Sequence, residues 1–380
     1  MPARELRRGG SNAADPWSAI GELHGQIGGE GLAFALIFCS PQYDLVAVSA
    51  AIRHHFGETA VFGCTTAGEI TPFGYISGGM SGIGFPAGEF SVVPTLFLGL
   101  KDFKIAMAID QTRHAMERRA ESMAGGSMRS GDTFALLLID GMSMREEQLA
   151  SAVGNTLNGM PLVGGSAGDG MDFNRSHVFC GHDFIADAAI LLLVTTRRRF
   201  SVFKTEHFVP TGSKMVVTGA DLDRRRVYEI NAEPAAEEYA RVAGLAGMPL
   251  SPTIFAAHPV MVRVGGEYHV RAIQKVNPDK SLTFFCAIDE GIVLTAARGV
   301  DILEDLKDLF RRLRREVGPP DLILGCDCVL RNLEIEQRQL KSAVSSLFVE
   351  QHVVGFCTYG EQYMSMHVNQ TLTGVIIGAP

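Results

Sequence analysis

The chain has 380 residues, 46% of them hydrophobic and 20% charged, which is enough apolar material for two folded domains and excludes a largely disordered protein. Its 34 basic and 42 acidic residues give a net charge of −8, which argues against a nucleic-acid-binding protein because phosphate binding requires a basic surface. No apolar stretch approaches the roughly 18 residues of a membrane-spanning helix, and seven cysteines are an odd number for a disulfide framework. We therefore expect a cytoplasmic protein without a secretory signal.

The glycines lie in three similar segments of the chain. Each segment starts with an apolar run, continues through a helix-like stretch into a second apolar run, and ends in a glycine-rich turn with an acidic residue. The first apolar runs are residues 35–40, 136–141 and 322–327, and the helix-like stretches are residues 45–56, 145–157 and 333–348. The turns are residues 63–69 (GCTTAGE), 164–169 (GGSAGD) and 355–361 (GFCTYGE).

Continuous apolar runs of five or six residues are typical of strands that are buried on both faces, with helices packed over the sheet. We therefore predict an α/β protein of two related domains, with mixed β-sheets covered by helices and built from repeated strand–helix–strand–glycine-rich-turn units. The predicted domains are residues 31–222 and 223–380, after a flexible N-terminus of residues 1–30.

Between the second and third segments the pattern is different. We expect a helix over residues 231–243, with Pro234 in its first turn. Residues 260–264, 268–276 and 282–288 have the pattern of strands, and residues 300–317 carry leucines at the spacing of an amphipathic helix.

The glycine-rich turns admit two interpretations. They are either tight turns that let one layer pack against another, or a rim of accessible backbone N–H groups that binds a small ligand or cofactor. They match neither the phosphate-binding loop nor the dinucleotide-binding fingerprint, so they do not indicate a nucleotide. In both cases Gly63, Gly68, Gly355 and Gly360 are expected to tolerate alanine poorly, because alanine adds a Cβ where positive φ or close packing is expected.

The turns at residues 63–69 and 164–169 resemble the N-terminal half of FIST (F-box and intracellular signal transduction) proteins. Residues 327–331 (DCVLR) and 354–361 (VGFCTYGE) resemble the C-terminal half, so that the resemblance covers about residues 33–378. Three further segments are similar to the bacterial NosP branch: residues 204–210 (KTEHFVP), 229–235 (EINAEPA) and 367–371 (HVNQT).

The NosP resemblance implies a cytoplasmic haem-binding sensor of nitric oxide, without enzymatic activity of its own, that regulates a histidine kinase or a cyclic-di-GMP enzyme. It also allows a homodimer. The chain has no Cys-x-x-Cys-His motif, so the implied cofactor is a non-covalent haem b.

Haem iron most often takes a histidine as its protein ligand. Our preferred metal ligand is His182, at the turn of a hairpin predicted over residues 178–184, with Phe179 and Phe184 as neighbouring cofactor-binding residues. His207 and His367 are the other cofactor-binding candidates, since they lie in the NosP-like segments. In any of these positions the alternative is a histidine with an ordinary structural or surface role.

Two other functions stay open from the sequence. One is a haem-free FIST module that binds a small metabolite, such as an amino acid, at the glycine-rich turns. The other is a thiol-dependent hydrolase that uses Cys64 with His54 or His55 as base, although no third residue that would orient the base is evident.

Overall fold

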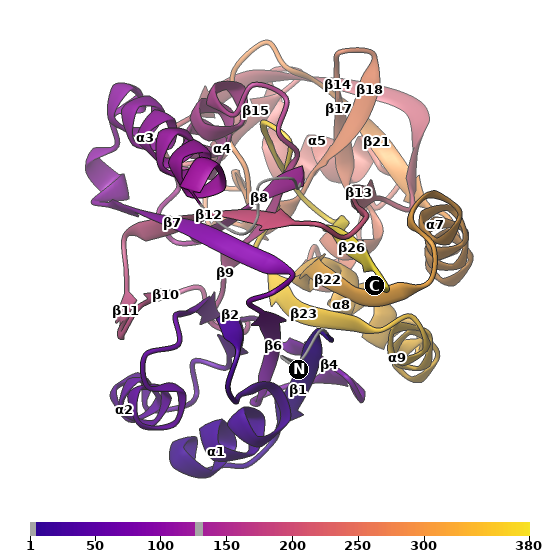
Figure 1. The fold of residues 1–380 in the computed structure, drawn as a ribbon. Coiled ribbons are helices and arrows are strands. Elements are labelled where there is room, and N and C mark those ends of the chain that lie inside the picture. The colour runs from indigo at the N-terminus through magenta and orange to yellow at the C-terminus, as the bar shows by residue number, and fades with distance from the viewer. Residues whose placement is uncertain (1–4, 126–131) are drawn as a thin grey trace.

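The structure is a computed structural model, which describes residues 5–125 and 132–380. Three copies of one structural unit follow one another along the chain and pack together (Figure 1). We call residues 7–86 unit 1, residues 90–196 unit 2 and residues 200–378 unit 3; within unit 3, residues 208–299 form an additional subdomain, the insertion. The predicted α/β architecture with mixed sheets, helical cover and repeated units is confirmed.

The main elements follow in the same order in each unit, with an additional 3-10 helix in unit 2 and two helices in place of one in unit 3. Unit 1 consists of β1 (Arg7–Ser11), α1 (Pro16–Ile27), β2 (Leu32–Cys39), α2 (Leu45–Phe56), β3 (Val61–Thr65), β4 (Glu69–Thr71), β5 (Gly74–Ile76) and β6 (Met80–Pro86). Unit 2 consists of β7 (Phe90–Leu98), the short 3-10 helix η1 (Leu100–Asp102), α3 (Ile105–Gly125), β8 (Asp132–Asp140), α4 (Glu146–Thr156), β9 (Leu162–Ala167), β10 (Val178–Cys180), β11 (Asp183–Ile185) and β12 (Ala188–Thr196). Unit 3 consists of β13 (Phe200–Thr205), α7 (Ile302–Val317), β22 (Pro320–Cys328), α8 (Val329–Gln337), α9 (Lys341–Glu350), β23 (Val353–Thr358), β24 (Glu361–Tyr363), β25 (Met366–Val368) and β26 (Leu372–Gly378).

The insertion carries a separate antiparallel sheet with its own apolar core. Its elements are β14 (Phe208–Asp221), β15 (Arg226–Ile230), β16 (Glu233–Pro234), α5 (Ala235–Val242), α6 (Pro252–Ala257), β17 (Val260–Val264), β18 (Glu267–Arg271), β19 (Ile273–Val276), β20 (Leu282–Phe284) and β21 (Val293–Gly299). Arg225, at the β14–β15 turn, fastens the insertion to unit 2, because its guanidinium lies 2.6 Å from Glu146 and 2.7 Å from Glu147 at the start of α4.

The three units exchange their short hairpins in a closed cycle. Every unit forms a sheet from its four longer strands, with one parallel pair at the centre: β2–β3, β8–β9 and β22–β23. The hairpin β4–β5 of unit 1 adds to β23 of unit 3, β24–β25 of unit 3 adds to β9 of unit 2, and β10–β11 of unit 2 adds to β3 of unit 1. Each glycine-rich turn therefore leads the chain from its own sheet into the next one.

The alternation of side chains along the strands explains why the predicted strands read as continuous apolar runs. In β2, Phe34, Leu36 and Phe38 point into a central core that all three sheets share, whereas Ala35 and Ile37 point outward under α1 and α2. The other two sheets are covered in the same way, one by α3 and α4 and the other by α7 and α9. Burial of large apolar side chains on both faces contributes about 1.5–3 kcal/mol per residue to folding.

The parallel strands approach each other closely at one glycine in each unit. Gly63, Gly164 and Gly355 occupy equivalent positions in β3, β9 and β23. A Cβ on these glycines would lie 1.7 Å from the carbonyl oxygen of Ile37, 1.9 Å from that of Leu137 and 1.8 Å from that of Gly325, respectively. No side chain fits at such distances, so the glycines are required by the spacing of the strands.

Two local expectations from the sequence are corrected. The segment expected to be a flexible N-terminus carries β1 and α1, which pack on the sheet of unit 1; α1 begins with Pro16 after Asp15, whose carboxylate accepts a hydrogen bond from the Ser18 amide. The helix expected over residues 333–348 is two helices, α8 and α9, which are separated at Arg338–Leu340. The amphipathic pattern runs through this break, so it did not indicate where α8 ends.

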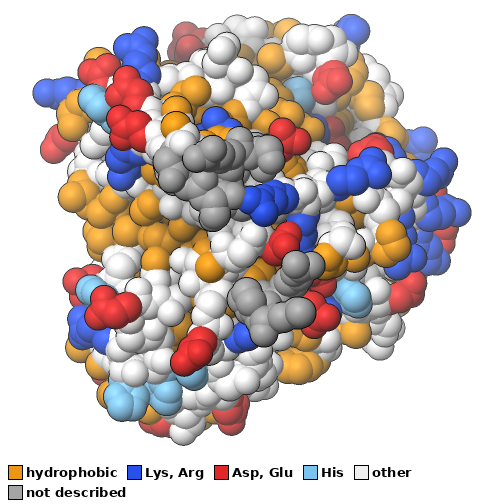
Figure 2. All heavy atoms as spheres, in the orientation of Figure 1, with side chains coloured by type: hydrophobic (Ala, Val, Ile, Leu, Met, Phe, Trp, Pro, Cys, Tyr) orange, Lys and Arg blue, Asp and Glu red, His pale blue; other side chains and the backbone are white. Residues whose placement is uncertain are grey.

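Charge is unevenly distributed over the face shown in Figure 2. Exposed basic side chains gather over α7, where Arg311, Arg312, Arg314 and Arg315 follow one another around Leu313. Among the described residues, no helix combines the length and the apolar character that a membrane crossing requires.

Candidate functional site

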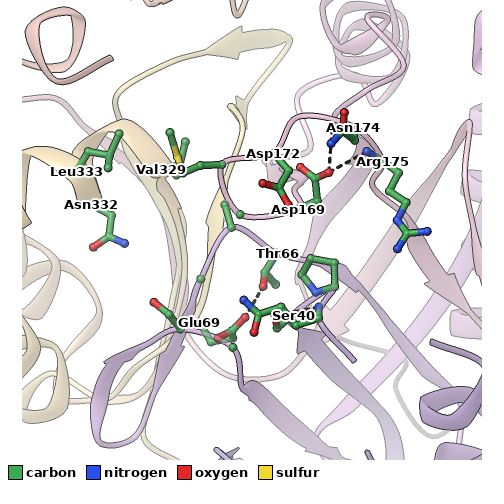
Figure 3. A pocket seen from close by; sticks show the side chains of 18 of the residues that line it. Ser40, Thr66, Glu69, Asp169, Asp172, Asn174, Arg175, Val329, Asn332 and Leu333 are labelled. Atoms are coloured by element: carbon green, nitrogen blue, oxygen red, sulfur yellow. Dashed lines mark hydrogen bonds between the residues drawn. The ribbon is translucent and has the colours of Figure 1, made fainter. Parts of the chain in front are cut away.

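A cavity of about 710 Å³ lies where the three units meet, and we call it the turn cavity. Its wall is built from segments that follow the carboxyl ends of β2, β3, β5, β9 and β22: residues 40–42, 66–69, 77–78, 169–175 (apart from Phe173) and part of α8. In open α/β sheets ligands bind outside the carboxyl ends of the strands. The turn cavity is therefore our candidate site, and Figure 3 shows the side chains around it.

Glu69 lies in the wall of this cavity with no exposed surface. Its carboxyl group accepts hydrogen bonds from the Thr66 hydroxyl and, over 3.1 Å, from the backbone N–H of Gly79. In unit 3 the equivalent residue Glu361, which is also fully buried, accepts hydrogen bonds from the hydroxyl groups of Thr358 and Thr371. Glu69 and Glu361, which end the first and third turns, are thus buried, and their hydrogen bonds stabilise the hairpin of their own unit.

Burial raises the pKa of both carboxyl groups, to about 7 for Glu69 and to about 8 for Glu361, although the threonine hydroxyls act in the opposite direction. A buried carboxyl group without a cationic partner is more stable when it is neutral. Both carboxyl groups therefore titrate near neutral pH, and Glu69 does so in the wall of the turn cavity.

The acid of the second turn has a different role. Unit 2 has a longer segment between its turn and its hairpin, and the Asp169 carboxylate organises this segment by accepting hydrogen bonds from the backbone N–H groups of Phe173, Asn174 and Arg175. The Tyr359 hydroxyl, from the turn of unit 3, donates to the same carboxylate. The loop at residues 169–175 is therefore fixed to the meeting point of two units.

This loop contributes Asp172 and Arg175 to the lining of the cavity. Both are exposed, and neither forms an ion pair with any residue that the structure describes. Across the cavity α8 contributes Asn332, whose Oδ1 atom is buried and has no hydrogen-bond partner among the described residues (Figure 3). The lining of the cavity therefore includes an acidic and a basic residue without an ion pair to any described residue. It also includes an amide oxygen without a hydrogen-bond partner among the described residues.

His182, the preferred metal ligand, lies where the sequence placed it. It occupies the turn of the hairpin β10–β11, and its side chain is exposed. Phe179 is 1% exposed and packs in the core under α1 and α2, with the partly buried Phe184 at a ring-centroid distance of 4.8 Å. Phe179 is therefore turned to the interior rather than to the surroundings of His182.

His207 is part of a buried network of charged groups. Its Nε2 atom lies 2.7 Å from Glu334, and its Nδ1 atom lies 2.9 Å from the Arg331 guanidinium, which also donates to Asp327. Since arginine only donates, Nδ1 is the acceptor and the proton is on Nε2. Burial lowers the pKa of His207, in agreement with a neutral ring. Both ring nitrogens are thus occupied in this structure.

His367 is also internal, at 3% exposure, and burial lowers its pKa. Its ring lies 3.3 Å from the Gln362 amide and 3.5 Å from the Asn369 amide, directly beneath Gly360. A Cβ at Gly360 would come within 2.3 Å of this ring, which explains why the third turn requires a glycine. Among the described residues, no histidine lines the turn cavity, and His182, His207 and His367 lie in separate surroundings.

Cys64 lies in the central core with no exposed surface, and burial raises the pKa of its thiol well above the usual value. A cysteine nucleophile requires an accessible thiolate and an adjacent base. His54 and His55 are on the last turn of α2, on the other face of the sheet. This arrangement does not support the hydrolase that used Cys64.

The sequence reasoning located the glycine-rich turns but not Asp172, Arg175 and Asn332. These residues are in a loop and on a helix without a recognisable spacing, and only the packing of unit 2 against unit 3 brings them together. The one available signal was the length of chain between the second turn and its hairpin, which exceeds that in units 1 and 3.

Comparison with protein-family models identifies two successive domains: the FIST N domain over residues 33–233 and the FIST C domain over residues 235–364. The chain belongs to the FIST family. FIST domains are sensory modules, so the protein is a sensor in signal transduction. The resemblance to the family that the turns indicated is confirmed, whereas these models do not address the NosP branch.

Other comparisons add little. No curated protein matches the chain. Among solved structures, the cyanuric acid hydrolase from A. caulinodans is similar over 100% of this chain and 99% of that chain, with 11% sequence identity and a TM-score of 0.37. A similarity at this level carries no conclusion about catalysis.

Proposed function

We propose that this FIST protein senses a small zwitterion, such as an amino acid, in the turn cavity. The observation that carries this proposal is that Asp172 and Arg175, which form no ion pair with any described residue, both line one cavity. An α-amino acid offers the complementary ammonium and carboxylate, and the buried Oδ1 atom of Asn332 can accept a further hydrogen bond from the ammonium. Both charges come from the loop that the Asp169 carboxylate organises, so a bound ligand would contact that loop at two positions.

The cavity also suggests how binding is transmitted. The turn at residues 66–69 lines the cavity and continues directly into β4, which pairs with β23 of unit 3. The loop at residues 169–175 continues into β10, which pairs with β3 of unit 1. A ligand that favours one position of these segments would shift the equilibrium between two arrangements of the sheets. We propose that a separate histidine kinase or cyclic-di-GMP enzyme reads that change.

The zwitterion proposal predicts which ligands bind. In a calorimetric titration with the twenty L-amino acids, at least one should bind, whereas its amide and its N-acetyl derivative, which each lack one charge, should bind at least tenfold more weakly. Asp172→Asn and Arg175→Gln should each weaken binding of the intact amino acid by about tenfold or more, without lowering the melting temperature, because both side chains are exposed.

Asp289→Asn is the matched control, since Asp289 is exposed and does not line the cavity. It should bind the amino acid like the wild type. Binding that survives both Asp172→Asn and Arg175→Gln would contradict the proposal.

Haem-dependent detection of nitric oxide is the second candidate, and one observation favours it: the His182 ring is exposed and makes no hydrogen bond with a described residue. His207 and His367 do not fit a haem in this structure, because their rings are buried and hydrogen-bonded. Phe179, which was expected to contact the haem beside His182, is turned inward, so the exposed His182 ring is the part of the predicted site that fits a haem. A haem would supply the iron that binds nitric oxide, and His182 would hold it.

A haemin titration tests this candidate. If the protein binds one haem b per chain through His182, equimolar haemin should give a sharp, saturable Soret band that His182→Ala loses, while His114→Ala, a change at another exposed histidine, keeps it. Loss of the band in His207→Ala together with its retention in His182→Ala would show that another histidine binds the iron. A spectrum of free haemin only would remove haem from the function.

A further inference from the structure

The insertion contains a second cavity, of about 460 Å³, which shares no lining residue with the turn cavity. It lies between two antiparallel strand pairs of the insertion sheet, the hairpin β17–β18 and the pair β14–β21, which appear together in the upper right of Figure 1. Nothing in the proposed amino-acid site uses it.

This cavity opens where two neighbouring strands separate. β17 and β21 pair at Val260–Ala296 and Met261–Thr295, and no further pairs follow. Continued in the same register, Val262 would pair with Leu294 and Arg263 with Val293; instead the cavity lies between them, lined by Val262–Val264 on one side and Ile292–Val293 on the other. On their outer sides β17 stays paired with β18, and β21 with β14. Each strand thus presents an unpaired edge to the cavity.

The charged side chains in the lining of this opening are of one sign. Lys214, Arg263 and Arg271 line it, without any acidic side chain in the lining. None of the three forms an ion pair with a residue that the structure describes, and Arg263 packs over the Tyr268 ring at 5.9 Å. The apolar part of the lining consists of Val262, Val264, Ala287, Ile292 and Val293. In a protein with a net charge of −8, this is a local positive site with an apolar wall.

We propose that the opening between β17 and β21 binds an extended acidic segment of a partner protein, which adds as a strand between them. Exposed strand edges bind extended peptides through main-chain hydrogen bonds, and the pockets beside the edge select the side chains. A peptide backbone would form hydrogen bonds with the unpaired strand edges, and acidic side chains on that peptide would pair with the three cations. A small carboxylate would satisfy the cations but not the strand edges.

The probe is a fluorescein-labelled, capped hexapeptide of alternating valine and glutamate, measured by fluorescence anisotropy with the full-length protein. We expect saturable binding that weakens about tenfold or more when lysine replaces glutamate, or when alternate peptide nitrogens are methylated, because the first change reverses the charge and the second removes main-chain donors. Amides in residues 262–264 and 292–294 should exchange hydrogen more slowly when the peptide is bound.

The protein variant is Lys214→Glu with Arg263→Glu. Both side chains are exposed, so the double variant should keep the wild-type circular dichroism and melting temperature while binding the probe at least tenfold more weakly. Arg298→Glu, an exposed change on β21 outside the cavity, is the matched control and should bind normally. Failure to bind the probe, equal affinity for the methylated peptide, or unchanged binding in the double variant would each overturn the proposal. Retained amino-acid binding in the same double variant keeps this test separate from that of the turn cavity.

Discussion

Gly63→Ala and Gly355→Ala should each destabilise the protein by about 3 kcal/mol or more, or prevent it from accumulating in soluble form. The new Cβ would lie 1.7 or 1.8 Å from a backbone oxygen of the neighbouring parallel strand, so the strands must separate at the centre of the sheet. A flexible side chain could move aside, but a backbone oxygen that belongs to the sheet cannot. Thermal melting of the purified variants, followed by circular dichroism, measures the effect.

The same substitution at Gly25 is the control. Gly25 is in α1, and a Cβ there meets no atom within 4 Å. Alanine in a helix restricts the unfolded chain more than glycine does, so Gly25→Ala should be neutral or should stabilise by about 0.5–1 kcal/mol. A Gly63→Ala variant that melts at the wild-type temperature would show that the close approach of β2 and β3 is not required.

The second large effect is a loss of stability as the pH rises. Glu69 and Glu361 have folded-state pKa values of about 7 and about 8, above the ordinary value of 4.5 that applies to the unfolded chain. Between these values the folded protein binds more protons than the unfolded chain. Below pH 4.5 both groups are protonated in the folded and in the unfolded protein, and their contribution to the free energy of unfolding is complete. As the pH rises from 4.5 to the folded-state pKa, this free energy decreases by up to about 1.4 kcal/mol per pH unit for each group.

Glu361→Gln isolates this contribution, because an amide cannot ionise; its oxygen can accept the hydrogen bond from the Thr371 hydroxyl, and its NH2 group can donate to the Thr358 hydroxyl oxygen. Chemical denaturation should show the variant more stable than the wild type at pH 9 by a few kcal/mol, with the difference declining toward pH 5. The exposed Glu58, changed to glutamine, is the control and should give no such difference. A constant difference between pH 5 and pH 9 would show that Glu361 titrates normally.

The sequence predicted the repeated elements well where the signal is local. The helix expected over residues 45–56 is α2, and the strand expected over residues 260–264 is β17, each with the predicted bounds. The hairpin with His182 at its turn also formed as expected. These elements depend on apolar periodicity and on short-range turns, which a single sequence contains.

The exchange of hairpins could not be predicted in this way. The pairing of β4 with β23 joins residues that are far apart in the chain, and nothing within residues 69–76 indicates which strand they will join. The candidate site depends on that exchange, since the turns meet only after the units have closed on one another. The turns were therefore recognised as special, while Asp172 and Arg175 were missed.

The cyclic exchange of hairpins also means that the two family domains are not separable bodies. A chain cut between residues 233 and 235 would leave the β22–β23 sheet without the hairpin that residues 69–76 supply, and would leave β9 without the one from residues 361–368. In each fragment one strand, β9 or β23, would then have an unpaired edge. Evolution can thus vary the loops and the insertion of such a protein piecemeal, but it must inherit, lose or duplicate the three-part ring as a whole.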